Sequence, residues 1–262
     1  MATFKDRTGE RFKNRDDLGG YEFVIVEYNK RSDVWVEFQD EHKARVHTEY
    51  KHCKNGGVKN PYHPSVRGIG YVGIGKYVPT INNKMTDEYN DWKHMIKRCY
   101  DINYLEQHST YKNVYVCRRW HNFQNFAEWW HNNYYEIEGE QMCLDKDILI
   151  KGNKEYAPDK CIFVPQRINT LFVKNDMNRG NLPIGVSYCK QNGKYHARCR
   201  VTDKINGRKE IHLGYYNTPY EAFLAYKQFK EAYIKQVADE YKDKIPQRLY
   251  DAMYNWIVEE DD

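Results

Sequence analysis

Alternating apolar and polar positions in the last third of the chain predict a three-stranded sheet. The three strand-like runs cover residues 184–190, 194–203 and 209–216. The pairs Asn192-Gly193 and Asn206-Gly207 separate them, and each pair predicts a tight hairpin because both residue types accept positive φ. The sheet is therefore expected to be antiparallel and built from neighbouring strands.

The second run has one apolar and one basic face, because successive strand residues point to opposite sides of a sheet. The apolar face is Tyr195, Ala197, Cys199 and Val201, and the basic face is Lys194, His196, Arg198 and Arg200. A helix is predicted over residues 219–238, with Thr218 as N-cap and Pro219 at its first position. Its apolar spacing predicts that it covers the apolar face.

The same region is strongly basic. Between residues 176 and 212 the sequence has eight Lys or Arg residues and three acids, whereas the net charge of the whole chain is +4. The runs IGVSYCKQNGKYHARCRV and LGYYNTPYEAFLAYKQF resemble the APETALA2-type DNA-binding domain over about fifty residues. That resemblance implies a sheet lying in the major groove of double-stranded DNA. The contact candidates it implies are Tyr188, Lys190, Lys194, His196, Arg198, Arg200, Lys209 and His212. The alternative is a solvated basic face on a small sheet.

The first 80 residues are expected to form a small β-rich domain. The runs 21–29 and 33–40 alternate like strands and are rich in aromatic and β-branched residues, which predicts a two-hairpin meander or a small barrel. The Gly- and Pro-dense stretch 54–77 is expected to be an ordered loop or connector.

Two helices are predicted in the middle of the chain. Apolar residues recur at helical spacing between Thr86 and Tyr100, and aromatic residues do so from about Asn122 to Asn133. The following stretch, 142–169, is expected to fold as strand, loop, second strand and helix, with the helix beginning near Pro165.

This strand–strand–helix stretch, MCLDKDILIKGNKEYAPDKCIFVPQRIN, resembles the HNH endonuclease motif of phage homing endonucleases. With the preceding YKNVYVCRRWHNFQNFAEWW, the similarity spans roughly residues 89–172. The resemblance implies a ββα-metal unit that holds Mg²⁺ or Mn²⁺ near the scissile phosphate. Carried over by position, it makes Asp145 and Asn169 the metal ligands.

Lys146 occupies the position of the histidine base of that family. A lysine is almost wholly protonated at neutral pH unless burial or a nearby cation makes its proton easier to lose. The catalytic candidates are therefore Asp145, Lys146 and Asp147, with three alternatives. Lys146 could clamp phosphate while Asp147 or a nearby histidine acts as base; cleavage could be very slow; or the site could be a lapsed nuclease kept for DNA binding. Lys160, where the family often has Asn, is a second departure.

Taken together, the sequence predicts an α+β protein in three parts. These are a small β-rich domain with a connector (residues 1–80), a helical leader with the HNH-like ββα-metal unit (81–175), and the APETALA2-type domain with C-terminal helices (176–262). The length of 262 residues fits several small cores better than one large one.

The sequence also gives expectations about cellular location, cysteine chemistry and the chain's acidic end. No run is long enough to span a membrane and the first residues lack the apolar core of a signal peptide, so we expect a cytoplasmic location, that of the host cell if the chain is phage-encoded. The seven cysteines are scattered without a Cys-x-x-Cys pair and are expected to be reduced. The acidic end, residues 259–262, is expected to be frayed.

Three functions remain open from the sequence. The first is a homing-endonuclease-like protein that binds duplex DNA and nicks or cuts it with Mg²⁺ or Mn²⁺. The second is a DNA-binding or regulatory protein with a lapsed metal site. The third is an inhibitor that binds a host nucleic-acid enzyme through protein contacts.

Overall fold

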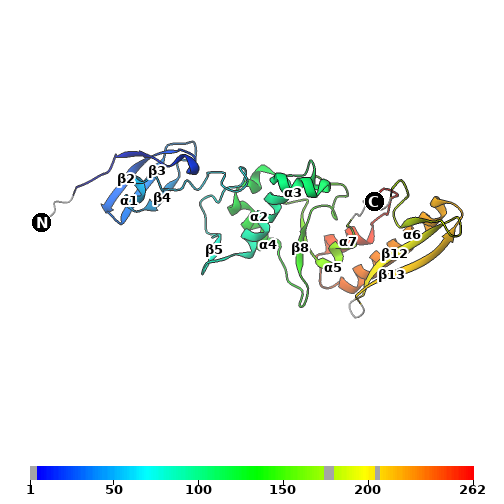
Figure 1. The fold of residues 1–262 in the computed structure, drawn as a ribbon. Helices are drawn as coiled ribbons and strands as arrows, with labels where there is room; N and C mark the ends of the chain where they lie inside the picture. The colour runs from blue at the N-terminus through cyan, green and yellow to red at the C-terminus, as the bar shows by residue number, and fades with distance from the viewer. Residues whose placement is uncertain (1–4, 174–179, 204–206) are drawn as a thin grey trace. The chain divides into compact units, whose positions relative to one another are not determined.

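The computed structural model describes residues 5–173, 180–203 and 207–262. The chain is a mixed α+β protein with several small sheets (Figure 1). It divides into two compact units, which are described separately. The first unit contains Met1–Asn133 and Lys154–Pro158, and the second contains Tyr134–Asn153 and Asp159–Asp262. Residue Asn206 of the second predicted hairpin pair and the predicted boundary between residues 175 and 176 lie outside the described residues.

The first unit begins with a four-stranded antiparallel meander. Its strands, in spatial as well as chain order, are β1 (Arg11–Lys13), β2 (Glu22–Lys30), β3 (Asp33–Phe38) and β4 (Arg45–Thr48). The predicted alternation is confirmed, since Phe23, Ile25, Val34, Val36 and Phe38 are all buried in one core. A 3₁₀ turn (Asp16–Leu18) lies between β1 and β2, and the short helix α1 (Tyr50–Lys54) follows β4.

The rest of the first unit is mainly helical. Helices α2 (Asp87–Tyr100) and α4 (Phe123–Asn133) confirm the two predicted helices and pack against each other. Trp92, Met95, Phe123 and Phe126 are fully buried. The remaining elements are the hairpin β5 (Thr80–Ile81) and β6 (Lys84–Met85), helix α3 (Ile102–Gln107), the parallel pair β7 (Tyr115–Val116) and β9 (Glu155–Tyr156), and 3₁₀ turns at Ser109–Tyr111 and Arg118–His121.

The second unit combines a strand–strand–helix segment with a three-stranded sheet. Strand β8 (Met142–Asp145) pairs antiparallel with β10 (Ile162–Pro165), and helix α5 (Gln166–Asn169) follows directly. The sheet contains β11 (Val186–Cys189), β12 (Lys194–Asp203) and β13 (Gly207–Tyr216) in that order, and helix α6 (Pro219–Tyr241) packs on it. Helix α7 (Gln247–Tyr254) packs against α6. The order of β8, β10 and α5 agrees with the prediction for residues 142–169, except that the short strand β9 lies within the predicted loop.

One hydrophobic core joins these two parts of the second unit. Ile162, Val164 and Ile168 of the strand–strand–helix segment lie in the same buried cluster as Ala197 of β12 and Phe223 of α6. Burying these apolar side chains together is the main stabilising contribution available to such a small unit. The strand–strand–helix segment and the three-stranded sheet are therefore parts of one folded body.

Local signals explain where helix α6 begins. The Thr218 hydroxyl accepts a hydrogen bond from the backbone N–H of Glu221, and the Glu221 carboxylate accepts one from the backbone N–H of Thr218. This reciprocal capping box, with Pro219 in the first turn, satisfies backbone donors that would otherwise lack partners. The helix extends to Tyr241, three residues beyond the predicted end.

The acidic C-terminus is held in place, so the prediction of a frayed end is wrong. The Lys151 ammonium group lies 2.6 Å from the Glu259 carboxylate and 2.7 Å from that of Asp262. The backbone carbonyl of Glu260 accepts a hydrogen bond from the N–H of Ile184. Ion pairs and backbone bonds to distant segments therefore order the terminus.

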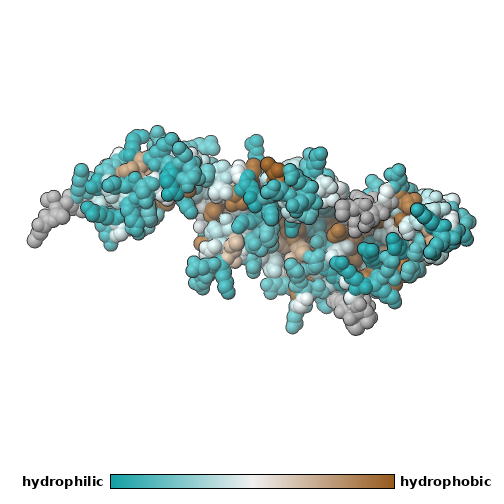
Figure 2. All heavy atoms as spheres, viewed as in Figure 1, coloured by the Kyte–Doolittle hydropathy of each residue, from teal (hydrophilic) through white to brown (hydrophobic). Residues whose placement is uncertain are grey.

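The face seen in Figure 2 is mostly hydrophilic, with hydrophobic residues in small groups. The seven cysteines are free and lie buried or half-buried. In the described part of the chain, no helix has both the length and the apolar character needed to cross a bilayer.

Candidate functional site

The three-stranded sheet of the second unit has one covered face and one open face. Ala197 and Cys199 of β12 are buried under α6, whereas Arg198 and Arg200, which alternate with them, are exposed. We define the open face by the side chains that share the side of Arg198 and Arg200. They are Ser187 and Cys189 of β11, Lys194, His196, Arg198, Arg200 and Thr202 of β12, and Arg208, Glu210, His212 and Tyr215 of β13.

A single carboxylate lies between two arginines on the open face. Arg200 is directly opposite Glu210 in the strand register, and its Nε lies 3.5 Å from Oε2 of Glu210. Arg198 Nη1 donates to Oε1 of the same glutamate at 3.3 Å. The Arg198 and Arg200 side chains remain 44% and 75% exposed. Glu210 therefore offsets part of the positive charge and holds both guanidinium groups on one surface.

Three rings adjoin these arginines. Tyr215 stacks on His196 with ring centroids 4.6 Å apart, and His196 lies beside His212, with Nε2 of His196 3.1 Å from Nδ1 of His212. Burial lowers the pKa of His196, the positive charges of His212 and Arg198 lower it further, and Glu210 opposes them. An N–H···N bond needs one protonated and one unprotonated nitrogen, so it disfavours charge on both rings.

The strand register separates the residues predicted to contact DNA. Lys194, His196, Arg198, Arg200 and His212 all lie on the open face.

The other three predicted contacts lie elsewhere. Tyr188 pairs with Tyr195 and Lys209 with Val201, so both belong to the side of the sheet that α6 covers, and Lys190 lies beyond the end of β11. Lys209 and His212 are three positions apart in one strand, so they face opposite sides of the sheet. The sequence alone therefore could have shown that they do not share a face. We therefore exclude Tyr188, Lys190 and Lys209 from the open face.

Arg208, Glu210 and Tyr215 are open-face residues that were absent from the sequence-based set. Arg208 and Glu210 could have been found by counting in twos from His212. Tyr215 could not, because the register shifts between Ala197 and Arg198 and adds one residue to β13. With these included, four cations and one carboxylate occupy the described open face.

Asp145 lies at the end of β8 and shapes the turn that follows. Its Oδ1 accepts hydrogen bonds from the backbone N–H groups of Asp147 and Ile148, both at 2.8 Å. Burial raises the pKa of Asp145, and the charge of Asp147 adds to the rise, whereas the two N–H bonds and Lys146 lower it. Oδ1 is thus committed to the turn, which leaves Oδ2 as the oxygen for any external ligand.

Lys146 is buried and its hydrogen-bonding capacity is filled. Its ammonium group donates to both carboxylate oxygens of Asp147, at 2.8 and 2.7 Å, and to the backbone carbonyl of Asn153 at 2.9 Å. An ammonium group has three donors and no acceptor. Lys146 therefore stabilises the loop. Its ammonium group cannot accept a proton, and its three donors are already used, so none is left for a phosphate. The same bonds engage the carboxylate of Asp147, the other candidate base. The sequence has no histidine between His131 and His196.

Asn169 is the last residue of α5, which packs against both β8 and β10. The neighbouring Arg167 anchors this helix, since its Nε donates to the carbonyl of Thr202 in β12 at 3.2 Å and its guanidinium group pairs with Glu240 of α6. The strand–strand–helix segment is thus fixed to the sheet that carries the open face.

Asp145 and Asn169 offer the oxygen ligands that Mg²⁺ takes in proteins, usually with several waters. The donor types fit the ion that the HNH resemblance implies. No cluster of three or more His, Cys, Asp or Glu side chains suited to a metal occurs within the described ranges.

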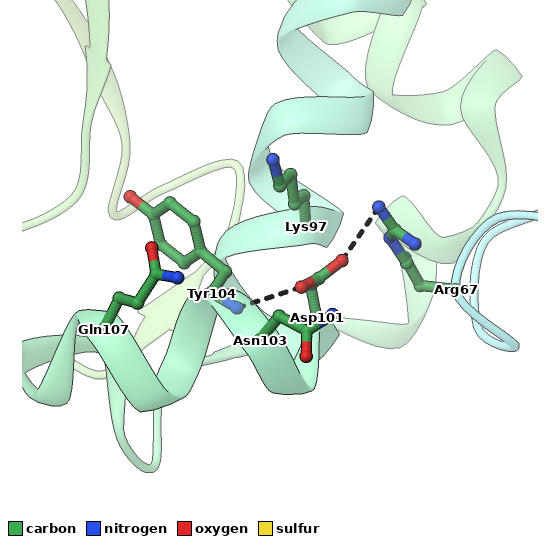
Figure 3. A pocket seen from close by; sticks show the side chains of 6 residues that line it. All are labelled: Arg67, Lys97, Asp101, Asn103, Tyr104 and Gln107. Atoms are coloured by element: carbon green, nitrogen blue, oxygen red, sulfur yellow. Dashed lines mark hydrogen bonds and ion pairs between the residues drawn. The ribbon is translucent and has the colours of Figure 1, made fainter.

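The first unit contains a polar pocket of about 320 Å³ (Figure 3). Its one carboxylate, Asp101, lies 2.8 Å from Nη2 of Arg67 and also accepts a hydrogen bond from the backbone N–H of Tyr104 at the start of α3. Lys97 and two amide side chains complete the lining. Each carboxylate oxygen of Asp101 thus has one partner, Oδ2 the Arg67 guanidinium group and Oδ1 the Tyr104 N–H. These contacts give Asp101 a structural role at the start of α3.

No protein-family model, curated protein or solved structure matches this chain.

Proposed function

We propose that this protein binds duplex DNA through the open face of the β11–β13 sheet. The observation that carries the proposal is the set of four cations, Lys194, Arg198, Arg200 and Arg208, on one exposed strand surface. Among the residues that the structure describes on this face, Glu210 is the one carboxylate. A two- or three-stranded surface fits the width of the major groove, and arginine donors suit both phosphates and guanine edges. The resemblance of this segment to the APETALA2-type domain supports the same partner.

The aromatic and imidazole rings supply the second part of the surface. Tyr215, His196 and His212 form a row beside the arginines, and their polar edges can donate to or accept from bases and phosphates. Protein–DNA interfaces combine positive charge with polar, hydrated contacts of this kind. We assign the arginines to affinity and the row of rings to base contacts.

Direct binding tests the proposal. A labelled mixed-sequence duplex is titrated with the wild-type protein and with Arg198→Ala/Arg200→Ala at low salt, and the dissociation constants are compared. The proposal requires binding by the wild type and a clear loss in the double variant. If the wild type binds no duplex at low salt, the proposal is wrong, and a protein partner becomes the better explanation of the surface.

Metal-dependent nicking of DNA is the second candidate function. Oδ2 of Asp145 and helix α5 with Asn169 support it, since these residues would hold a Mg²⁺ or Mn²⁺ ion that polarises the phosphate. The hydrogen bonds of Lys146 argue against nicking. The lysine that the resemblance aligns with the base is a hydrogen-bonded cation, and the adjacent carboxylate of Asp147 is its partner. DNA binding without efficient cleavage is therefore the function that the geometry supports best.

A further inference from the structure

The first unit contains a long stretch without acidic residues, which includes the connector and the β5–β6 hairpin. From residue 50 to residue 86 the sequence has no Asp or Glu, but it has six Lys or Arg residues. These are Lys51, Lys54, Lys59, Arg67, Lys76 and Lys84. Arg67 pairs with Asp101 and Lys51 with Glu49, whereas Lys76 and Lys84 are exposed in the segment that includes the β5–β6 hairpin. This stretch has the charge of a surface that meets a polyanion.

The hairpin also exposes large apolar side chains. Ile81 is 58% exposed and Met85 53%, and Ile74 and Val78 nearby are also exposed. We call residues 74–85 the arm; Figure 1 shows its β5–β6 hairpin extending from the helices α2 and α4. In the hairpin register Ile81 is paired with Lys84 and shares its face, whereas Met85 is paired with Thr80 on the opposite face. Ile81 therefore exposes an apolar side chain next to a lysine near the tip of the hairpin.

The arm has a defined conformation. Asn82 and Asn83 at its tip have φ values of 50° and 60°, the pair of positive angles that a tight type I′ hairpin requires. Its base is fixed to α4, since the Gln124 side chain accepts a hydrogen bond from Tyr77 N–H and donates one to the Tyr77 carbonyl. At the end of the arm, the backbone N–H of Thr86 donates a hydrogen bond to the carbonyl of Pro79 at 3.1 Å.

We infer that the arm is a second DNA-binding element, which enters the minor groove of a duplex. This inference rests on the proposed DNA binding. The narrow tip carries the residue types that minor-groove arms use: asparagine amides for the acceptors on base edges, lysines for the flanking phosphates, and an apolar side chain against a base step. Ile81 supplies the apolar contact, Asn82 and Asn83 supply the amides, and Lys76 and Lys84 supply the charge.

The test measures duplex binding by the full chain over a range of salt concentrations. A plot of the logarithm of the association constant against the logarithm of the salt concentration has a negative slope. In Lys76→Ala/Lys84→Ala, the loss of two phosphate contacts makes this slope shallower by about 2. We expect its dissociation constant at low salt to rise at least about fivefold. Ile81→Ser should raise the dissociation constant about threefold and leave the salt slope unchanged, because it removes an uncharged contact. Lys30→Ala/Lys112→Ala removes the same charge from exposed positions of the same unit and should change neither quantity.

The outcomes separate this inference from the proposed function. If the arm variants bind like the wild type while Arg198→Ala/Arg200→Ala binds weakly, the arm does not contact DNA and the proposed function stands. Absence of wild-type binding overturns both.

The groove is tested with distamycin, which occupies the minor groove of A·T-rich duplexes. Distamycin should weaken the wild type toward the affinity of the arm variants and affect those variants little. An equal effect on wild type and arm variants would exclude minor-groove entry.

Discussion

The ammonium group of Lys146 lies 2.8 and 2.7 Å from the two carboxylate oxygens of Asp147, its neighbour in the chain. The third donor of the same group binds the carbonyl of Asn153 across the loop. Lys146, the side chain that the resemblance aligns with the HNH base, is thus bound as a cation within the loop. This arrangement favours a loop-stabilising role for Lys146 over a catalytic one.

Removal of this lysine should destabilise the protein. Lys146→Ala breaks three hydrogen bonds and leaves the Asp147 carboxylate and the Asn153 carbonyl without their donor, so we expect the free energy of unfolding to fall by about 2 kcal/mol. Denaturant unfolding followed by circular dichroism measures the change. Lys154→Ala, at an exposed position in the adjoining segment, should stay within about 0.5 kcal/mol of the wild type. Equal midpoints for both variants would show that the Lys146 bonds contribute nothing.

Neutralising Glu210 should strengthen DNA binding. Glu210→Gln removes the carboxylate that pairs with Arg198 and Arg200 and leaves two guanidinium groups available to phosphates. We expect the dissociation constant for duplex DNA to fall several-fold at low salt, as measured by fluorescence anisotropy. Glu138→Gln makes the same charge change at an exposed position outside the strands of this sheet and should have no more than a small effect. Weaker binding by Glu210→Gln would mean that the glutamate orders the arginines more than it screens them.

DNA affinity should rise as pH falls through the range in which histidine titrates. The pKa of His196 is lowered in the free protein by burial and by the positive charges of His212 and Arg198. The negative potential of a bound duplex favours the protonated ring even where the ring contacts bases, so binding raises the pKa of His196 and is coupled to proton uptake. Affinity should therefore increase from pH 8 toward pH 5.5, by titration at constant ionic strength. In His196→Gln/His212→Gln this increase should be largely absent, and an unchanged pH profile would place the two rings outside the interface.

The metal site can be tested without disturbing the turn. Asp145→Asn keeps an oxygen that can accept the N–H bonds of Asp147 and Ile148 but removes the negative charge that a divalent ion requires. Supercoiled plasmid is incubated with each protein and Mg²⁺ or Mn²⁺, and open circles are quantified on gels. If the second candidate function holds, the wild type nicks slowly and Asp145→Asn reduces the rate at least tenfold. Equal nicking by both proteins would remove Asp145 from the site, and intact plasmid throughout would favour binding alone.

Local sequence signals predicted much of the fold. Thr218, Pro219 and Glu221 mark the start of α6 because a helix cap is decided within four residues. The β11–β12 hairpin could be predicted from Asn192-Gly193 and the alternation around this pair, because a tight turn is also determined by a few neighbouring residues.

Features set by distant contacts could not be predicted in this way. The register shift at Ala197 and Arg198 depends on how β13 pairs, and it places Tyr215 on the open face. The ordered C-terminus depends on Lys151, more than one hundred residues away in the chain. The partners of Lys146 likewise follow from the shape of a loop, which the resemblance to the HNH motif did not determine.

The salt dependence of DNA binding shows whether Arg198 and Arg200 of the open face contact the duplex. Dissociation constants for one duplex are measured between about 50 and 300 mM salt for the wild type, for Arg198→Ala/Arg200→Ala, and for the exposed control pair Arg11→Ala/Arg31→Ala. If the open face binds the duplex, the double variant at Arg198 and Arg200 binds at least about tenfold more weakly, and its salt slope is smaller by about 2. The control should match the wild type in both quantities. If the Arg198→Ala/Arg200→Ala variant has the affinity and the salt slope of the wild type, the open face does not bind the duplex, and some other surface does.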